Sequence, residues 1–277
     1  MRAGPGIDKN APKKKGFFLY FELFIRKIGK IIGSNALYCA VSLPWLILLY
    51  IFAPVGLMST TAQANADGEM YILLMMAFRV AFAFGIFILW GAGPSSAAYA
   101  YITRCFTREE HVWILSDGWD KFKENLKQSI VILIVDAIVI LLALNALMFY
   151  YSGYAQTGDI FWLATGYITV LMLVLYTVMH YYIYQLMVTF ECSIIQLYKN
   201  AMLLTLGKLP YNILLSAFAV CMIGVLYLLI SPYLSILLSI VIAVAFVLFP
   251  IEFFAARTLN KNIIDMKKKT QIKKNYL

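Results

Sequence analysis

The stretch Ser129-IVILIVDAIVILLALNALMFY-Tyr151 decides the fold of this chain, because its only charged residue is Asp136. A helix needs about 20 apolar residues to cross the hydrocarbon core of a bilayer, and this run is long enough. Inside hydrocarbon every backbone N–H and C=O group must be bonded within the segment, which a helix achieves. The stretch therefore predicts a transmembrane α-helix.

Five further apolar runs of similar character lie along the chain, at residues 36–57, 71–92, 160–187, 211–230 and 234–255. The 277 residues are 62% hydrophobic and only 13% charged, whereas an ordinary soluble domain carries roughly 25% charged residues. This composition excludes a soluble globule. We therefore predict an all-α, polytopic membrane helical bundle with six transmembrane helices.

The polar and basic segments divide the chain into four parts. They are a polar basic cytoplasmic tail (residues 1–16), an interfacial amphipathic helix (17–35), the six-span domain (36–255) and a second basic cytoplasmic tail (256–277). The amphipathic helix is predicted because Glu22, Arg26 and Lys30 recur every four residues among Phe, Leu, Ile and Tyr. This helix would lie at the inner interface or pack against the bundle.

Basic residues fall on alternate connections between the predicted spans. All but one of the 23 Lys and Arg residues lie in the N-terminal segment, the second and fourth connections or the C-terminal segment. By the positive-inside tendency, these segments and both termini are cytoplasmic. The net charge of +9 is thus explained by membrane topology. We expect membrane lipids as partners of the basic tails and no nucleic-acid partner.

A group of small residues follows the second predicted span: Gly91, Gly93, Pro94, Ser95 and Ala97. The pairs 91/95 and 93/97 have the small-xxx-small spacing that lets helices approach closely. Pro94 lacks a backbone donor and predicts a kink or break of the helix near the inner leaflet. Such a break serves helix packing or, in transporters, forms a hinge or half of a binding site.

Only two charged residues lie well inside the predicted spans, Arg79 and Asp136. An unpaired ion at this depth costs at least about 2.5 kcal/mol, so we expect a mutual ion pair or a shared polar cavity. The pair would be structural or part of an ion or proton relay. A relay would lack a second carboxylate in the core, because we expect Glu252 to pair with Arg257 near the inner end of the last span. His180 is expected to be a hydrogen-bonded interfacial residue.

Two inner connections have the character of ordered docking surfaces for a cytoplasmic partner. In the first, Asp117 is placed to cap an amphipathic helix that leads into the third span. The second connection, residues 191–210, is short and faces inward. The candidate docking residues are Asp117, Phe122, Asn125, Gln128, Glu191, Asn200, Leu209 and Pro210.

Catalytic signatures are not found in the sequence, which has no GxSxG, HExxH, P-loop or strand-linked GxGxxG motif. The two His and four Cys residues are scattered and do not have the spacing of a metal cluster. We therefore expect a protein that is not an enzyme, with no catalytic residues, no bound metal and no cofactor.

Two parts of the chain resemble the YesL family of bacterial integral membrane proteins. They are Gly93-Pro94-Ser95-Ser96-Ala97-Ala98-Tyr99-Ala100, followed by Trp113, Asp117, Phe122, Lys123, Asn125 and Gln128, and the later stretch from Asn200 to Pro210. The family is a domain of unknown function in Gram-positive bacteria, commonly encoded beside carbohydrate ABC importers. The resemblance implies a multi-pass protein of the bacterial plasma membrane that is associated with carbohydrate uptake.

The stretch from Glu191 to Pro210 is also similar to the cytoplasmic EAA loop by which ABC importer permeases dock on their ATPase, although Leu197 stands where that loop has glycine. Our functional hypothesis is an accessory or permease-like subunit associated with carbohydrate ABC transport, with permease or ATPase subunits as partners. The alternative is an autonomous small-solute or ion transporter that uses Arg79 and Asp136.

Overall fold

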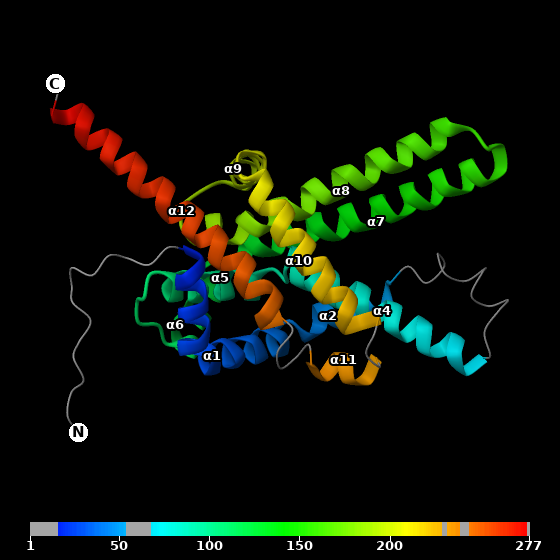
Figure 1. Cartoon of the computed structure of the whole chain (residues 1–277), viewed down its shortest axis with the longest axis horizontal. Coiled ribbons are helices and arrows are strands. Elements are labelled where there is room, and N and C mark those ends of the chain that lie inside the picture. The colour runs from blue at the N-terminus through cyan, green and yellow to red at the C-terminus, as the bar shows by residue number, and fades with distance from the viewer. Residues whose placement is uncertain (1–15, 54–67, 229–231, 239–243, 276–277) are drawn as a thin grey trace.

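The computed structural model describes residues 16–53, 68–228, 232–238 and 244–275, and this part of the chain contains helices and no strand (Figure 1). The all-α prediction is therefore confirmed. In chain order the helices are α1 (Gly16–Val41), α2 (Leu43–Ile51), α4 (Gly68–Trp90), α5 (Pro94–Thr107), α6 (Ile114–Glu124), α7 (Leu126–Thr157), α8 (Ile160–Met187), α9 (Ile194–Gly207), α10 (Leu209–Leu228), α11 (Pro232–Leu238) and α12 (Val244–Asn275).

Three helices, α7, α8 and α10, are long and apolar enough to cross a membrane on their own. Two bent pairs give further candidate crossings, α1 with α2 at an angle of 61° and α4 with α5 at 57°. By length and composition, these are the helices of a multi-pass membrane protein. The sixth predicted span, residues 234–255, includes residues 239–243, which lie outside the described part of the chain.

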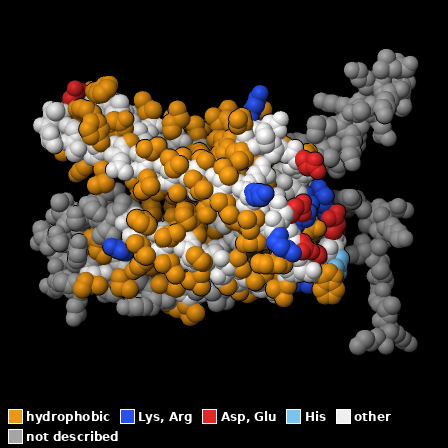
Figure 2. Space-filling model, turned by 180° about the vertical axis from the view of Figure 1, so that it is seen from behind, with side chains coloured by type: hydrophobic (Ala, Val, Ile, Leu, Met, Phe, Trp, Pro, Cys, Tyr) orange, Lys and Arg blue, Asp and Glu red, His pale blue; other side chains and the backbone are white. Residues whose placement is uncertain are grey.

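The surface of the molecule is apolar over most of its length. On the α7–α8 hairpin, Leu142, Tyr167 and Met172 are 67%, 67% and 62% exposed. Figure 2 shows a broad hydrophobic surface with the charged side chains gathered at one end, where α5 and α6 lie. An apolar surface of this extent marks an interaction site in water, whereas lipid tails are its ordinary surroundings in a bilayer.

The core lies around the final turns of α8. From Val178 to Met187 every α8 side chain except that of Met179 is buried, whereas Ile160 at the other end of the helix is 76% exposed. This buried part of α8 packs among α4, α5, α7, α9 and α12. It therefore forms the centre on which the other helices converge.

The second predicted span breaks before α5. Helix α4 ends at Trp90, α5 begins at Pro94, and Gly91 and Gly93 between them have φ angles of +87° and +63°. Only glycine adopts this left-handed region readily, because it has no Cβ atom. The prediction that these two glycines form small-xxx-small helix contacts is wrong. Such contacts require both small residues to lie on one continuous helix, and both glycines lie between α4 and α5.

The backbone groups freed by the break are bonded by side chains. The N–H group of Ala92 donates to Ser96 Oγ at 2.7 Å, and the N–H group of Gly93 donates to the Tyr184 hydroxyl oxygen at 3.2 Å. A buried backbone donor without a partner would cost free energy comparable to a lost hydrogen bond. Ser96 and Tyr184 therefore make the break stable inside an apolar core.

The first bent pair meets the second at its own bend. Helix α1 continues through residues 35 and 36, where we expected the interfacial helix to end, and the chain bends at Ser42, two residues before Pro44. The hydroxyl groups of Ser42 and Ser95 are hydrogen-bonded at 2.5 Å, and that of Tyr38 is 2.9 Å from Ser96 Oγ. These bonds fix the two bends against each other.

We expect Gly91→Ala to destabilise the protein by about 2 to 4 kcal/mol, the sum of a left-handed backbone penalty and overpacking. A Cβ atom at this position would lie 2.5 Å from Ser96 Oγ and 2.7 Å from Tyr184 Cε2. Gly85→Ala in α4 is the matched control, because its Cβ atom would meet no atom within 4 Å. Unfolding in detergent micelles measures both, and equal stability of the two variants would contradict the prediction.

Candidate functional site

An acidic and a basic side chain meet in the core between α7 and α8. Nε2 of His180 lies 2.9 Å from Oδ1 of Asp136, and their side chains are 0% and 2% exposed. The two helices form a hairpin around the turn at Gly158 and Asp159 (Figure 1). Because both residues lie at nearly equal distances along the chain from this turn, the hairpin brings them to the same depth.

The partners of His180 define the positions of its protons. Nδ1 is 3.0 Å from the backbone carbonyl oxygen of Tyr176, which only accepts hydrogen bonds, so we assign a proton to Nδ1. The contact between Nε2 and Asp136 Oδ1 then needs one further proton, on the imidazole or on the carboxyl group. In either arrangement the pair has no net charge, which lowers the cost of burying it. The pair is therefore a buried site for one shared proton.

Aromatic side chains surround this pair. The Tyr176 hydroxyl group donates to Asp136 Oδ1 at 2.7 Å, and the Tyr198 hydroxyl oxygen lies 3.3 Å from that of Tyr176. Trp90, at the end of α4, stacks on the His180 ring with 5.4 Å between the ring centroids. Burial raises the pKa of Tyr198 on α9 to about 12, so this hydroxyl group keeps its proton at neutral pH. Because Tyr176 gives its single hydroxyl proton to Asp136, Tyr198 is left as the donor to Tyr176.

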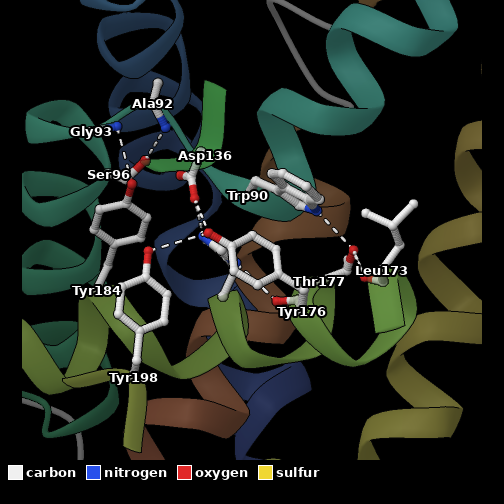
Figure 3. Close-up of polar contacts among 11 residues, drawn as sticks. Trp90, Ala92, Gly93, Ser96, Asp136, Leu173, Tyr176, Thr177, Tyr184 and Tyr198 are labelled. Carbon is white, nitrogen blue, oxygen red and sulfur yellow. Dashed lines mark hydrogen bonds and ion pairs between the residues drawn. The ribbon is translucent and has the colours of Figure 1, made fainter. Parts of the chain in front are cut away.

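The two carboxylate oxygens of Asp136 differ in their surroundings. Oδ2 is buried, and it has no hydrogen-bond partner among the residues that the structure describes. Figure 3 shows the carboxylate between the helix break at Ala92 and Gly93 and the hydroxyl group of Tyr176. A buried oxygen without a partner costs about 1 to 3 kcal/mol, and more if it is charged. This oxygen is therefore an available position for a proton.

A second carboxylate, that of Glu252 in α12, is also buried, at 4% exposure. It accepts a hydrogen bond of 2.5 Å from Nε2 of Gln185. The ion pair expected between Glu252 and Arg257 does not form, so that prediction is wrong. Both residues lie on α12, and side chains five positions apart on a helix point in directions about 140° apart. The guanidinium group of Arg257 lies instead beside Gly16 at the beginning of α1.

A small cavity lies between the two protonatable groups. His180 and Glu252 both line it, together with Gly91, Ser96 and Tyr184. The volume open to the centre of a water molecule in this cavity is about 10 Å³, close to the minimum that one bound water molecule requires. His180 and Glu252 therefore face a common space of about one water molecule, directly beside the helix break.

Arg79 does not form the ion pair that we expected with Asp136. Its guanidinium carbon is 5.7 Å from the centroid of the Tyr50 ring, a cation–π contact. Helix α4, which carries Arg79, packs on α2, α8 and α10, whereas α7 packs mainly on α8. The carboxylate of Asp136 therefore meets His180, and an aromatic ring of α2 attracts Arg79.

The candidate docking residues of the first inner connection make contacts with other residues of the same connection. Asp117 accepts a hydrogen bond of 2.9 Å from the backbone N–H group of Trp113 and caps α6. Phe122 stacks on Trp119 with 5.2 Å between the ring centroids. Asn125 is 9% exposed and donates to a backbone carbonyl group of the preceding turn. These contacts order the connection, and α6 is its outward-facing part.

The second inner connection is tied to α7. Nε2 of Gln128 donates to the backbone carbonyl oxygen of Cys192 at 2.7 Å. The helix in this connection, α9, begins with a capping box formed by Ser193 and Gln196. The remaining docking candidates are the exposed Glu191, Leu209 and Pro210 and the half-buried Asn200.

The chain has no significant match among protein-family models, curated proteins or solved structures. The described residues also include no group of three or more His, Cys, Asp or Glu side chains that could hold a metal ion. The candidate site is therefore defined by geometry, and membership of the YesL family stays a prediction.

From the sequence alone we did not expect His180, Tyr176 and Glu252 to be parts of this site. A usable signal was present for two of them. Tyr176 and His180 are four residues apart and share one face of α8, and this face lies opposite Asp136 in a hairpin with a short turn. Glu252 offered no such signal, because its partner Gln185 is far away in the sequence.

We expect a double-mutant cycle to couple Asp136 to His180 and not to Arg79. Asp136→Asn with His180→Phe, which keeps a ring against Trp90, should give a coupling energy of about 1 to 3 kcal/mol in unfolding. Asp136→Asn with Arg79→Gln should be additive within about 0.5 kcal/mol, since these side chains share no contact. A strong coupling to Arg79 would restore the pair that the sequence predicted.

Proposed function

We propose that the chain is a six-span protein of the bacterial plasma membrane with both termini in the cytoplasm. The helices α7, α8 and α10 and the two bent pairs would supply five spans, and α11 with the first turns of α12 would supply the sixth. The distribution of basic residues supports this orientation, since Arg79 is the only one within a predicted span. The first turns of α1 would then lie at the inner interface.

Within this membrane protein, we infer a proton-linked transporter of a small solute or ion. The observation that carries this proposal is the buried contact of Asp136 with His180, which requires a shared proton and lies beside a carboxylate oxygen that has no partner among the described residues. Ionisable groups inside a membrane domain are costly and commonly mark ion pathways or proton relays. The adjoining break between α4 and α5 resembles the discontinuous helices that form transporter binding sites.

Loss of the shared proton would destabilise the contact between the pair. A neutral His180 with its proton on Nδ1 presents a lone pair on Nε2, and this lone pair would face the Asp136 carboxylate at 2.9 Å. The resulting negative charge would also lie in a low-dielectric core. Both effects favour separation of α7 from α8, next to a break whose two glycines allow a change of helix direction.

Glu252 supplies a second station for the proton. It shares the water-sized cavity with His180. Both ring nitrogens of His180 are already hydrogen-bonded, Nδ1 to Tyr176 and Nε2 to Asp136, so one water molecule would connect the imidazole with Glu252 only after Nε2 leaves Asp136. Gln185, the hydrogen-bond partner of Glu252, also donates to the backbone carbonyl oxygen of Ala100 in α5. The second station is thereby linked to the helix that follows the break.

We expect Asp136→Asn to lower proton flux at least tenfold in vesicles reconstituted with the purified protein. An amide cannot hold the shared proton, so the first station would be lost while the size of the side chain is kept. A pH-sensitive dye inside the vesicles measures the flux under an imposed pH gradient. Glu252→Gln should lower the flux as well, because it removes the second station.

Asp159→Asn is the matched control for this experiment. Asp159 is exposed and caps α8 through the backbone N–H group of Phe161, and asparagine is an equally good cap. Its flux should equal that of the wild type. Absence of proton flux from the wild-type protein with any co-solute would overturn the proposal of an autonomous transporter.

A second candidate function is an accessory or permease-like subunit of carbohydrate ABC transport. It is favoured by exposed apolar side chains on α6 and α9, which lie outside the candidate crossings. Leu115 on α6 is 71% exposed, and Ile195 and Leu203 on α9 are 81% and 62% exposed. The resemblance of the chain to the YesL family points to the same partners.

We expect Ile195→Glu/Leu203→Glu to abolish co-purification with an ABC permease or ATPase from native membranes if this second function is correct. Two charges on the apolar face of α9 would introduce a desolvation penalty at the contact. Lys199→Glu, an exposed change on the same helix, is the control for added negative charge. A wild-type protein that always elutes alone would overturn this candidate.

A further inference from the structure

A cavity with a basic lining lies between α10 and α12. It has a volume of about 420 Å³, within the size range of small-molecule sites, and it is separate from the space around His180. Its lining comes from the beginning of α1, the end of α8, the junction of α9 with α10 and the middle of α12. The lining residues that carry the argument are Tyr182, Lys208, Tyr211, Phe254, Arg257 and Lys261.

Three cations face this cavity, Lys208, Arg257 and Lys261, and none of the described residues that line it is acidic. Ion pairs do occur among the described residues, but none of them involves these three side chains. Like charges gathered in one cavity repel one another, so the arrangement is stabilised when an anion enters. The cavity is therefore electrostatically suited to an anionic group.

Hydrogen-bond donors and apolar surface accompany the charges. The hydroxyl groups of Tyr211 and Thr258 belong to lining residues, and Tyr211 is 66% exposed. Phe17, Leu214 and Phe254 supply apolar walls, and Leu214 is 70% exposed on α10, one of the helices that can cross a membrane alone. The cavity thus presents positive charge beside a surface suited to hydrocarbon.

We propose that this cavity binds the headgroup of an anionic phospholipid, with the acyl chains along the exposed face of α10. A phosphate-bearing anion satisfies the three cations, and the apolar walls favour a lipid over free phosphate as its source. Basic pockets between transmembrane helices on the cytoplasmic side are recognised binding places for anionic headgroups. The site does not depend on the proton pathway, and it uses none of its residues.

The test is binding of phosphatidylglycerol or phosphatidylcholine to the full chain in detergent, followed by native mass spectrometry. We expect the wild type to prefer phosphatidylglycerol. Arg257→Gln/Lys261→Gln should bind it about 30-fold more weakly, from a contribution of about 1 kcal/mol for each cation near the membrane surface. Lys208→Gln alone should weaken binding about fivefold, which keeps the test available if the double variant fails to fold.

Lys127→Gln/Lys199→Gln is the matched control, because it removes the same charge from two exposed positions outside the cavity. Its binding of phosphatidylglycerol should equal that of the wild type. Equal loss in both double variants would mean diffuse attraction to the basic surface, and would overturn the proposal. Equal binding of the two lipids would also overturn the proposal, because the cavity would then not select an anionic headgroup. Full competition by inorganic phosphate would overturn it as well, because the ligand would then be the phosphate group alone and not a lipid.

Discussion

The contact between Asp136 and His180 is the interaction on which the interior of this protein depends. It places an acid and a base against each other where neither would be tolerated alone, and it holds α7 against α8 at the depth where α8 enters the core. Breaking a buried pair by removing one partner commonly costs about 3 to 5 kcal/mol, because the other charge is left uncompensated. The same property makes the pair sensitive to the gain or loss of one proton.

The break between α4 and α5 is the second feature that the pair helps to position. Trp90 ends α4 and stacks on His180, while the backbone donors of the break are bonded to Ser96 and Tyr184. A change at His180 therefore acts directly on the end of α4. Packed cores shift between discrete arrangements more readily than they deform continuously, which makes a glycine-containing break a suitable place for movement.

Charge and apolar surface divide the outside of the molecule in a way that agrees with a membrane setting. Apolar side chains cover the long hairpin, whereas cations gather together with acidic side chains at the end where α5 and α6 lie (Figure 2). Some of these cations have carboxylate partners, such as Lys121 with Glu124, but those of the cavity between α10 and α12 have none among the described residues. That difference separates a candidate lipid site from an ordinary charged surface.

The sequence by itself determined the helical class, the apolar spans and the break near Pro94, because hydropathy over about 20 residues and the missing N–H group of proline act locally. It also singled out Asp136 as a residue that needs a partner. Only the tertiary structure decided that this partner is His180 and that Arg79 turns to Tyr50, and only it brought Glu252 to the same cavity. Those outcomes depend on which helices are neighbours and on the rotation of each helix about its axis, and both are set by packing across residues far apart in the chain.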